Sequence, residues 1–480
     1  MSQPAHLFRA LLLATAALLS GCIPAYQAPP SDAKVNLPAA WRDNPAFYMT
    51  APGSPAWWTA FNDPQLTTLV TEALQNNADL AVAATRVREA RASLSQARSG
   101  FFPSVDLAAS GQSARSLTVL GPGESRSWQP QAELSWEVDL WGKTRAENRA
   151  ARAQLEASEA AQKGAMLSVA SATAESYIGL LGMDQQLKLT EDTVVSRRKA
   201  LDLIRSQVDG GYASALELTQ AESEYQSVLQ SVPRLQQALR QQENALSVLT
   251  GRVPGSIRKG SLQHLAVPAL PGIVPSELLR RRPDIVGAEK NLVASDETLR
   301  ARRADFLPQL NLSASIGEVY TSGLNYDPVR IWSYGGSVLA PLFTAGRLQA
   351  RYDVAVAQRD RAAWSYRATL LQALDEVEDG YAAQHYLQAQ RAHSDMRVAT
   401  LTRSLSVAQD RYQNGYASYL TVLDAQRSLY SSQLDNISLL QDYLVSYVTL
   451  YRALGGNISQ ANGNGQHQTR AEHSLADLRP

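Results

Sequence analysis

The chain has 480 residues, 45% of them hydrophobic, and its 45 Lys and Arg residues balance its 45 Asp and Glu residues. A formal net charge of zero lacks the basic excess of a nucleic-acid-binding protein, so nucleic acid is not expected as a partner. Because Cys22 is the only cysteine, no disulfide can form within the chain, and its stability must come from packing or assembly.

The first 21 residues are predicted to be a signal peptide, with Arg9 as the positive charge and residues 11–19 as the apolar stretch. The cleavage site, Leu19-Ser20-Gly21-Cys22, resembles the lipobox of bacterial lipoproteins, in which the cysteine is acylated and becomes the first residue. We therefore expect a lipid anchor at Cys22, where the alternative is a buried free thiol. Residues 22–63 are rich in proline and predict an extended arm.

From residue 64 onward the sequence presents one pattern twice. Asp79 and Pro103 recur 205 residues later as Asp284 and Pro308. Three further landmarks recur 204 residues later: Gly142 as Gly346, Gly251 as Gly455, and Gly211-Tyr212-Ala213-Ser214 as Gly415-Tyr416-Ala417-Ser418. A period this long exceeds that of solenoids and predicts a duplicated domain. The repeats are placed at residues 64–261 and 262–456, followed by a disordered polar tail at 457–480.

Each repeat contains two segments of alternating apolar and polar residues, which predict strands at 103–115, 127–140, 308–320 and 331–343. Strands of this length, with tryptophan and tyrosine in or near them, are typical of membrane barrels, where apolar side chains face outward and polar ones inward. No apolar run after the signal peptide reaches the roughly 20 residues of a spanning helix, so any crossing must be made by strands. The alternative is a half-buried sheet in a soluble domain.

Each repeat also predicts a long helical hairpin, at residues 142–250 and 346–454. Prolines are absent between Pro130 and Pro233, and a helix of roughly 65 residues would span about 100 Å. Gly211 and Gly415 supply left-handed stops at the turns. Ser214 followed by Glu217 is typical of a capping box that starts the return helix. A further helix is predicted at 275–305.

Four strands cannot close a barrel, because about eight is the smallest number, so a barrel requires several copies of the chain. In combination the motifs resemble the outer-membrane efflux channels typified by TolC and OprM, in their lipoprotein, NodT-like branch. The resemblance covers residues 24–456 and is carried by the segments at 136–143, 281–285, 341–347 and 419–427. It implies a mainly α fold with a membrane β-barrel, in which a homotrimer builds a 12-stranded outer-membrane barrel continued by a 12-helix periplasmic α-barrel.

The resemblance also implies a passive duct in a tripartite efflux pump, completed by a periplasmic adaptor and an inner-membrane transporter that supplies the energy. The hairpin turns, Gly211 to Ser214 and Gly415 to Ser418, would contact the adaptor. Without a nucleotide motif or a metal cluster, neither a cofactor nor an enzyme activity is expected. The alternatives are a duct for type I protein secretion with the same fold, and a coiled-coil periplasmic spacer lipoprotein.

The same resemblance places a periplasmic gate near the second hairpin turn, at Asp424, Arg427, Tyr412 and Arg411. Three carboxylates gathered by a threefold axis repel one another unless they are paired or bind cations, and a charged ring filters what passes. Asp424 and Arg427 lie three residues apart on one helix face, so they could instead pair with each other. Thr421 stands where some relatives carry a second acid, and Gln220 is the first-repeat equivalent of Asp424.

Overall fold

The computed structural model describes residues 24–42, 56–118, 121–268, 274–322 and 328–456. The expected signal peptide, Cys22 and the tail after residue 456 lie outside these ranges. The chain divides into two compact units. Unit 1 comprises Met1–Val35, Thr85–Ala160 and Gly287–Thr369, and unit 2 comprises Asn36–Ala84, Ala161–Val286 and Leu370–Pro480. Each unit takes segments from both predicted repeats, so the two halves of the sequence interleave.

The helices confirm the duplication, because corresponding helices have equal lengths. Helices α3 (Ala78–Ser99) and α7 (Pro283–Ala304) have 22 residues each, α4 (Lys143–Asp209) and α8 (Arg347–Gln413) have 67, and α5 (Ala215–Leu249) and α9 (Tyr419–Ala453) have 35. The glycines that recur at the 204-residue spacing all adopt left-handed backbone angles with φ between 71° and 84°. Glycine adopts this conformation without the steric cost that a Cβ brings, so the recurring glycines fit the same backbone geometry in both copies.

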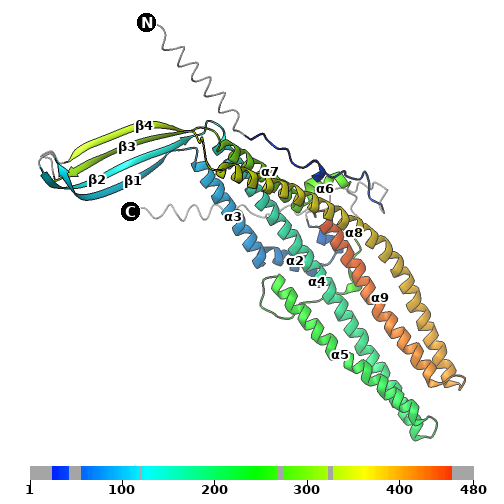
Figure 1. Ribbon diagram of the computed structural model, residues 1–480. Coiled ribbons are helices and arrows are strands. Elements are labelled where there is room, and N and C mark those ends of the chain that lie inside the picture. The colour runs from blue at the N-terminus through cyan, green and yellow to red at the C-terminus, as the bar shows by residue number, and fades with distance from the viewer. Residues whose placement is uncertain (1–23, 43–55, 119–120, 269–273, 323–327, 457–480) are drawn as a thin grey trace. The chain divides into compact units, whose positions relative to one another are not determined.

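Unit 1 contains one antiparallel sheet in the order β1-β2-β3-β4 (Figure 1). The strands are β1 (Ser104–Thr118), β2 (Gly121–Val138), β3 (Gln309–Thr321) and β4 (Val329–Leu339). The first hairpin is longer than predicted because pairing continues out to Thr118 opposite Gly121. Strand β4 ends at Leu339, before the predicted residue 343, since Pro341 has no N–H to donate to a ladder.

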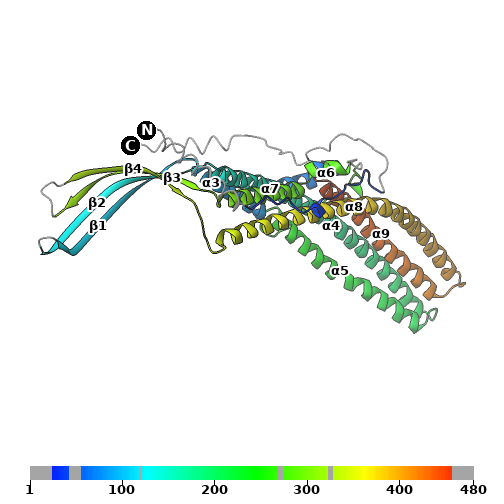
Figure 2. The same ribbon diagram turned by 45° about the horizontal axis from the view of Figure 1, so that its top comes forward.

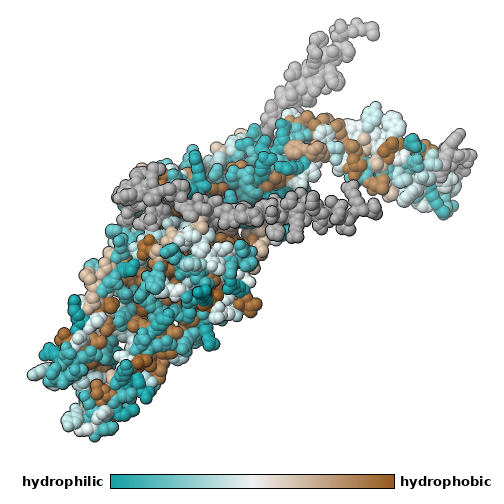
Figure 3. All heavy atoms as spheres, turned by 180° about the vertical axis from the view of Figure 1, so that it is seen from behind, coloured by the Kyte–Doolittle hydropathy of each residue, from teal (hydrophilic) through white to brown (hydrophobic). Residues whose placement is uncertain are grey.

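The sheet has one apolar and one polar face. Strand register places Leu107, Ala132, Ile316 and Trp332 in one row across the sheet. The adjacent row on the opposite face holds Asp106, Glu133, Ser315 and Ser333. On that face Ser104 bonds Ser135 and Ser315 bonds Ser333, each at 2.8 Å between hydroxyl oxygens. Trp332 and Tyr334 are exposed and stack with 5.8 Å between ring centroids. Figure 3 shows hydrophobic side chains in brown along the sheet. The predicted alternation therefore separates two chemically distinct faces.

The predicted single helix at 275–305 is wrong, because the structure divides it into α6 (Pro275–Arg281) and α7 (Pro283–Ala304). Arg282 between them is extended, with ψ of 119°. A proline disfavours helical backbone in the residue before it, so Pro283 enforces the break. Buried Arg282 then binds Glu376 at 2.8 Å and donates to the carbonyl of Ala453 at 2.9 Å. The break thus places the guanidinium of Arg282 where it can bind both α8 and α9 in unit 2.

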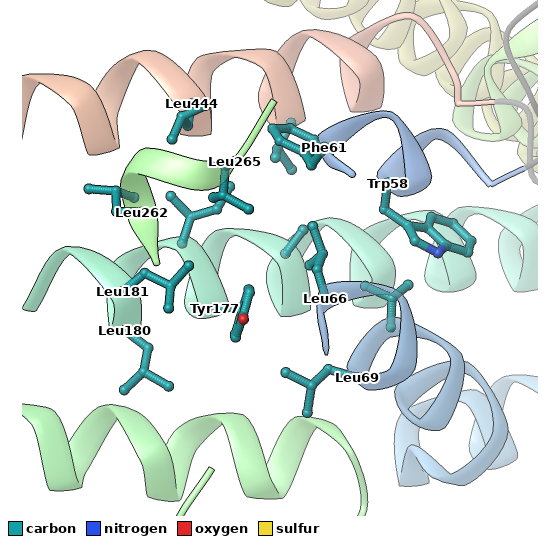
Figure 4. Packing of buried hydrophobic residues seen from close by; sticks show 14 of the residues in the cluster. Trp58, Phe61, Leu66, Leu69, Tyr177, Leu180, Leu181, Leu262, Leu265 and Leu444 are labelled. Carbon is teal, nitrogen blue, oxygen red and sulfur yellow. The ribbon is translucent and has the colours of Figure 1, made fainter. Parts of the chain in front are cut away.

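The core of unit 2 lies where short helices pack on the middle of α4. Helix α2 (Pro64–Asn76) begins with Asp63 as its cap, and Asn77 separates it from α3 by accepting from the N–H groups of Asp79 and Leu80. Figure 4 shows Phe61, Leu66, Tyr177 and Leu262 packed together, and all four are at most 2% exposed. The 3-10 helices η2 (Trp57–Phe61) and η3 (Leu262–His264) contribute to this cluster. The proline-rich segments therefore fold back onto the long helix.

Helices α4 and α5 form one hairpin and α8 and α9 form another, and both views show the two turns at the same end (Figures 1 and 2). Of the helices within the described residues, none is both long enough and apolar enough to cross a membrane.

The described part of the arm, residues 24–42, contains only the 3-10 turn η1 (Ser31–Ala33). In unit 1 its backbone carbonyls accept from side chains on helices α7 and α8. Tyr352 donates to Ala25 at 2.7 Å and Arg303 donates to Pro24 at 2.9 Å. Buried Arg359 donates to the carbonyl of Gln27. The arm is therefore held along these helices by its main chain.

Candidate functional site

The two hairpin turns share one backbone geometry. In the first turn, the N–H of Tyr212 donates to the carbonyl of Gln207 at 2.7 Å, and the N–H of Gly211 donates to Val208 at 3.0 Å. In the second turn, Tyr416 donates to Arg411 at 2.8 Å and Gly415 to Tyr412 at 3.0 Å. These bonds form a Schellman motif, which requires the left-handed glycine at each turn. The predicted stops at Gly211 and Gly415 are thus confirmed.

The starts of the return helices differ between the turns. Ser214 and Glu217 form the predicted capping box, in which each side chain binds the backbone N–H of the other residue. Ser418 caps α9 without a side-chain bond to the helix backbone. Thr421 stands where the first turn has Glu217, and its hydroxyl lies 3.4 Å from that of Ser418. The shorter threonine side chain completes no box, so only the first return helix has this stabilisation.

Both turns present exposed apolar side chains. Tyr212 is 90% exposed and Tyr416 is 76% exposed. One turn further, Leu216 and Leu420 are also exposed. Ala213 and Ala417 are half-buried between them. Each turn therefore offers a tyrosine and a leucine at matching positions, as expected of a pair of equivalent contact surfaces.

Behind the turns, the two hairpins pack against each other through a small core. It draws Leu201 and Ile204 from α4, Ala221 from α5, Ala408 from α8, and Tyr419, Val422 and Leu423 from α9. Tyr412 on α8 packs against the Tyr419 ring at 5.6 Å and donates to Gln207 at 3.3 Å. Burial, followed by the nearby Glu217, raises the pKa of Tyr412. Tyr412 therefore stays a neutral donor that links the second turn to the first hairpin.

Arg427 joins the hairpins by an ion pair that the sequence did not reveal. Its guanidinium binds the carboxylate of Glu224 on α5 through Nε at 2.7 Å and through Nη2. The Glu224 side chain is only 11% exposed, whereas that of Arg427 is 52% exposed. The bond to Glu224 raises the pKa of Arg427, to which Asp424 makes a smaller electrostatic contribution. The alternative considered above, an ion pair between Asp424 and Arg427, is absent among the described contacts.

A second guanidinium lies next to this pair. Arg197 on α4 is 5% exposed, and its Nε and Nη1 atoms have no hydrogen-bond partner among the described residues. Burial lowers the pKa of Arg197, and the neighbouring Glu224 and Tyr419 offset part of that effect while Arg427 adds to it. Glu224 thus lies near two arginines and binds only one of them, so the buried Arg197 has no ion pair among the described residues.

The remaining predicted gate residues form no described hydrogen bond or ion pair with this cluster. Asp424 is exposed on α9, and Arg411 is exposed on α8, where its carbonyl completes the second turn. The structure therefore brings Tyr412 and Arg427 into contacts between hairpins and leaves Asp424 open to solvent. The role of all four predicted residues in a gate stays a prediction. Cys22, the predicted lipid site, lies outside the described residues.

Sequence reasoning missed Glu224 and Arg197, although a signal was present. Glu224 follows Ala221 and precedes Val228, so it occupies an apolar stripe of α5 at three- and four-residue spacing. Arg197 occupies the corresponding stripe of α4 ahead of Leu201 and Ile204. A charged residue inside an apolar stripe indicates a buried partner. The stripe does not identify the buried partner, because the partner lies on another helix.

The matching family, the similar sequences and the similar solved structure agree with one another. Residues 69–252 and 274–456 match the profile of a family described as outer membrane efflux protein, so the match falls once on each repeat. The chain is 35% identical over 470 residues to the solvent efflux pump outer membrane protein SrpC of Pseudomonas putida, covering 94% of this chain and 99% of SrpC. It is 31% identical over 411 residues to the cation efflux system protein CusC of Escherichia coli, covering 84% and 88%. The solved structure of the outer-membrane channel OprN superposes with a TM-score of 0.82 at 27% identity, covering 90% of this chain and 98% of that one.

Proposed function

The chain belongs to the outer membrane efflux protein family, and on this basis we propose that it is the outer-membrane channel of a tripartite efflux pump. In this role it passively conducts drugs or other small solutes that an inner-membrane transporter delivers through a periplasmic adaptor. Relatives at similar identity are named for solvent efflux and for cation efflux, so the scaffold serves different solutes. The pump's substrate is therefore set by residues that differ among relatives or by the other components.

The observation that carries the proposal is the sheet in unit 1. Its four strands have an apolar and a polar face, and β1 and β4 each leave one edge without a strand partner within the described residues. Open edges with an apolar face are not stable in lipid, where every backbone group must be paired. Three copies joined edge to edge would form a closed barrel of 12 strands with a polar lumen. Edge closure requires more than one copy, and we propose three, the number that the family resemblance implies.

Two further parts of the chain fit the proposal. An acylated Cys22 would anchor the chain to the outer membrane, and the arm that follows is held along α7 and α8 by its carbonyls. The exposed Tyr212 and Tyr416 at the hairpin turns would contact the adaptor. Exposed aromatic residues are enriched at protein interfaces, which supports this assignment.

The gate would lie at the turns, where exposed Asp424 approaches its copies around a threefold axis. Arg427 would hold the hairpins together through Glu224 and so limit the opening. Release of α8 and α9 from α4 and α5 would then require the Arg427–Glu224 pair and the Tyr412–Gln207 hydrogen bond to break. We propose that these two contacts restrain the closed state, and that Asp424 sets the charge of the constriction.

Single-channel recording in planar bilayers tests the gate. Asp424→Ala, alone or with Arg427→Ala, should raise conductance. Asp424→Ala removes the charged ring, and Arg427→Ala removes the ion pair that joins the hairpins. Gln220→Ala is the matched control, since Gln220 is the equivalent position of the first repeat and carries no charge. Unaltered conductance of the Asp424 variants at both acidic and neutral pH would overturn the gate assignment.

Susceptibility testing examines the function as a whole. A deletion strain should become sensitive to drugs or solvents, and the intact gene should restore resistance. Unchanged sensitivity together with the loss of a secreted protein would instead identify a protein-secretion duct.

A further inference from the structure

A cavity of about 390 Å³ lies in unit 1 where the strands give way to helices. Trp141, just after β2, and Leu307, just before β3, form apolar parts of its wall. Four arginines line the remainder: Arg145 and Arg149 from α4, and Arg300 and Arg303 from α7. Arg145, Arg149 and Arg300 are each about half exposed, so they are accessible to a ligand from outside.

Nearby carboxylates neutralise part of the positive charge of the cavity. Arg145 binds Asp139 and Arg149 binds Glu297, each through Nε at 2.9 Å. Arg300 binds Asp296 and Glu297, both at 3.1 Å.

These carboxylates do not balance the four arginines. Three acids face four guanidiniums, and Asp296 also lies 3.9 Å from buried Arg359. Arg303 is the guanidinium in excess, because its described partner is the uncharged carbonyl of Pro24, which it meets through Nε at 2.9 Å. The Nη groups of Arg149 and Arg303 form no described bond, so they are available to an added anion.

The Arg303–Pro24 bond also places the cavity relative to the membrane. Pro24 follows Cys22 by two residues, a stretch of chain that spans at most about 7 Å. The acyl chains proposed on Cys22 enter the leaflet that faces the periplasm, so the cavity lies at the level of its headgroups. The ends of β2 and β3 independently place the cavity at the same depth in the membrane. The proposed barrel strands would cross the apolar layer, so their ends would lie at its periplasmic boundary. Trp141, half exposed, is the amphipathic residue expected at such a boundary.

We infer that this cavity binds the phosphate of an anionic phospholipid from the periplasm-facing leaflet. The inference rests on the proposed function, because it uses the lipid anchor and the membrane position of the strands. Guanidinium groups match phosphate geometry and bind it through paired N–H donors. Basic pockets at a membrane surface hold anionic headgroups in this way. The apolar wall of Trp141 and Leu307 would contact the glycerol and upper acyl region of the same lipid.

Native mass spectrometry of the detergent-purified protein tests the site. The probes are phosphatidylglycerol, and diacylglycerol with the same acyl chains but without phosphate. We expect the protein to retain phosphatidylglycerol, up to one per chain, in preference to diacylglycerol. The variant Arg149→Gln/Arg303→Gln should lower this retention about tenfold. The control Arg152→Gln/Arg302→Gln removes the same charge from the same two helices outside the cavity and should retain the lipid. Arg303→Lys, which keeps the charge, should lose less than Arg303→Gln.

Equal retention by the cavity variant and the control would overturn the inference, as would equal retention of diacylglycerol. Displacement of phosphatidylglycerol by an equal concentration of glycerol phosphate or inorganic phosphate would also overturn it, since the site would then take a soluble ion. Melting temperatures of the variants show whether they fold. Because the cavity is built within one chain, lipid counts per chain decide the inference even if the protein proves monomeric, which would contradict only the proposed channel.

Discussion

At the scale of single residues, an ion pair accompanies the apolar contact between the hairpins. Glu224 binds Arg427 and acts electrostatically on Arg197, which is buried nearby. Removal of a bound partner normally leaves a costly buried charge. Here a second guanidinium lies near enough to act electrostatically on Glu224, so we expect Glu224 to turn to Arg197 when Arg427 is removed.

Paired substitutions test this exchange. We expect Arg427→Met to lower the free energy of unfolding by only about 1 kcal/mol, since Glu224 turns to Arg197. Arg197→Met should be neutral or stabilising, because it removes a buried cation for which the described part of the chain supplies no ion pair. The double variant should lose about 3–5 kcal/mol, because it leaves Glu224 buried without a cation. Thermal melting in detergent measures these changes, with Arg198→Met, an exposed neighbour, as the control. Additive effects of the two substitutions would contradict the exchange.

Asp184 ties the proline-rich segment between α5 and α6 to the long helix. Its carboxylate binds Lys188 at 2.7 Å on α4 and Lys259 at 2.6 Å in that segment. Burial works to raise the pKa of Asp184, but the two lysines outweigh it and the pKa is lowered below its ordinary value. A carboxyl group with a lowered pKa stabilises the fold above the pKa of the unfolded chain, near 3.9. This stabilisation is lost as the pH falls through the folded pKa.

Asp184→Asn should therefore lower stability at pH 7 by about 1–2 kcal/mol, since two charge-assisted bonds to one carboxylate are weakened. The difference from the unsubstituted protein should shrink steadily as the pH falls below about 4, where Asp184 itself becomes protonated. Melting temperatures measured from pH 3 to pH 8 give the comparison. A difference that stays constant over this range would show that the ion pairs contribute nothing.

At the scale of elements, the two turns have the same backbone and different caps. The Schellman bonds and left-handed glycines are shared, whereas only Ser214 is part of a capping box. The second return helix therefore begins with less local support than the first. Since Asp424 and Arg427 lie in the first turns of that helix, the proposed gate is built on the less stabilised of the two starts.

The capping difference predicts unequal responses to one substitution. Ser214→Ala should destabilise the start of α5 by about 1 kcal/mol, because it removes a side-chain bond to the backbone N–H of Glu217. Ser418→Ala should cost clearly less, since Ser418 makes no such bond. Hydrogen exchange of amides in the two turns, measured on both variants, reports the local change. Equal acceleration at the two turns would contradict the structural difference.

The elements also show which features a sequence can reveal. Gly211, Gly415 and the Ser214–Glu217 box were predicted correctly, because their chemistry acts within a few residues of chain. The break at Pro283 was missed although its cause is equally local, since the helical pattern on both sides concealed it. Glu224 as the partner of Arg427 was not predictable, because that contact depends on the register between two hairpins. Spacing along the chain carries no information about that register.

At the scale of the whole molecule, β1 and β4 each have an edge with no strand partner among the described residues, and under the proposed function these edges call for assembly. A single chain with an open four-stranded sheet would expose backbone groups to lipid, whereas a ring of three chains pairs them all. Edge strands are otherwise sites of uncontrolled association, so a closed ring also protects the chain from aggregation. Under the proposed function, conduction and protection from aggregation would therefore depend on the same contact between chains.

Crosslinking tests this contact. Ser110→Cys on β1 with Ser333→Cys on β4 should allow a bifunctional maleimide to link neighbouring chains, giving species up to three chains in native envelopes. Each single substitution should give no such link. Ser135→Cys with Ser313→Cys, which face each other on β2 and β3, should crosslink within one chain and leave its size unchanged. Solitary subunits from the edge pair would contradict the ring.

The equal lengths of corresponding helices limit how the sequence of this protein can evolve. A single-residue deletion in a 67-residue helix would turn every later side chain by about 100° and shift it by about 1.5 Å, so all contacts beyond it would be lost at once. The strands escape this restriction, because β1 and β2 have 15 and 18 residues where β3 and β4 have 13 and 11. Insertions and deletions should thus accumulate among orthologues in the strand hairpins, while the helices diverge by substitution alone.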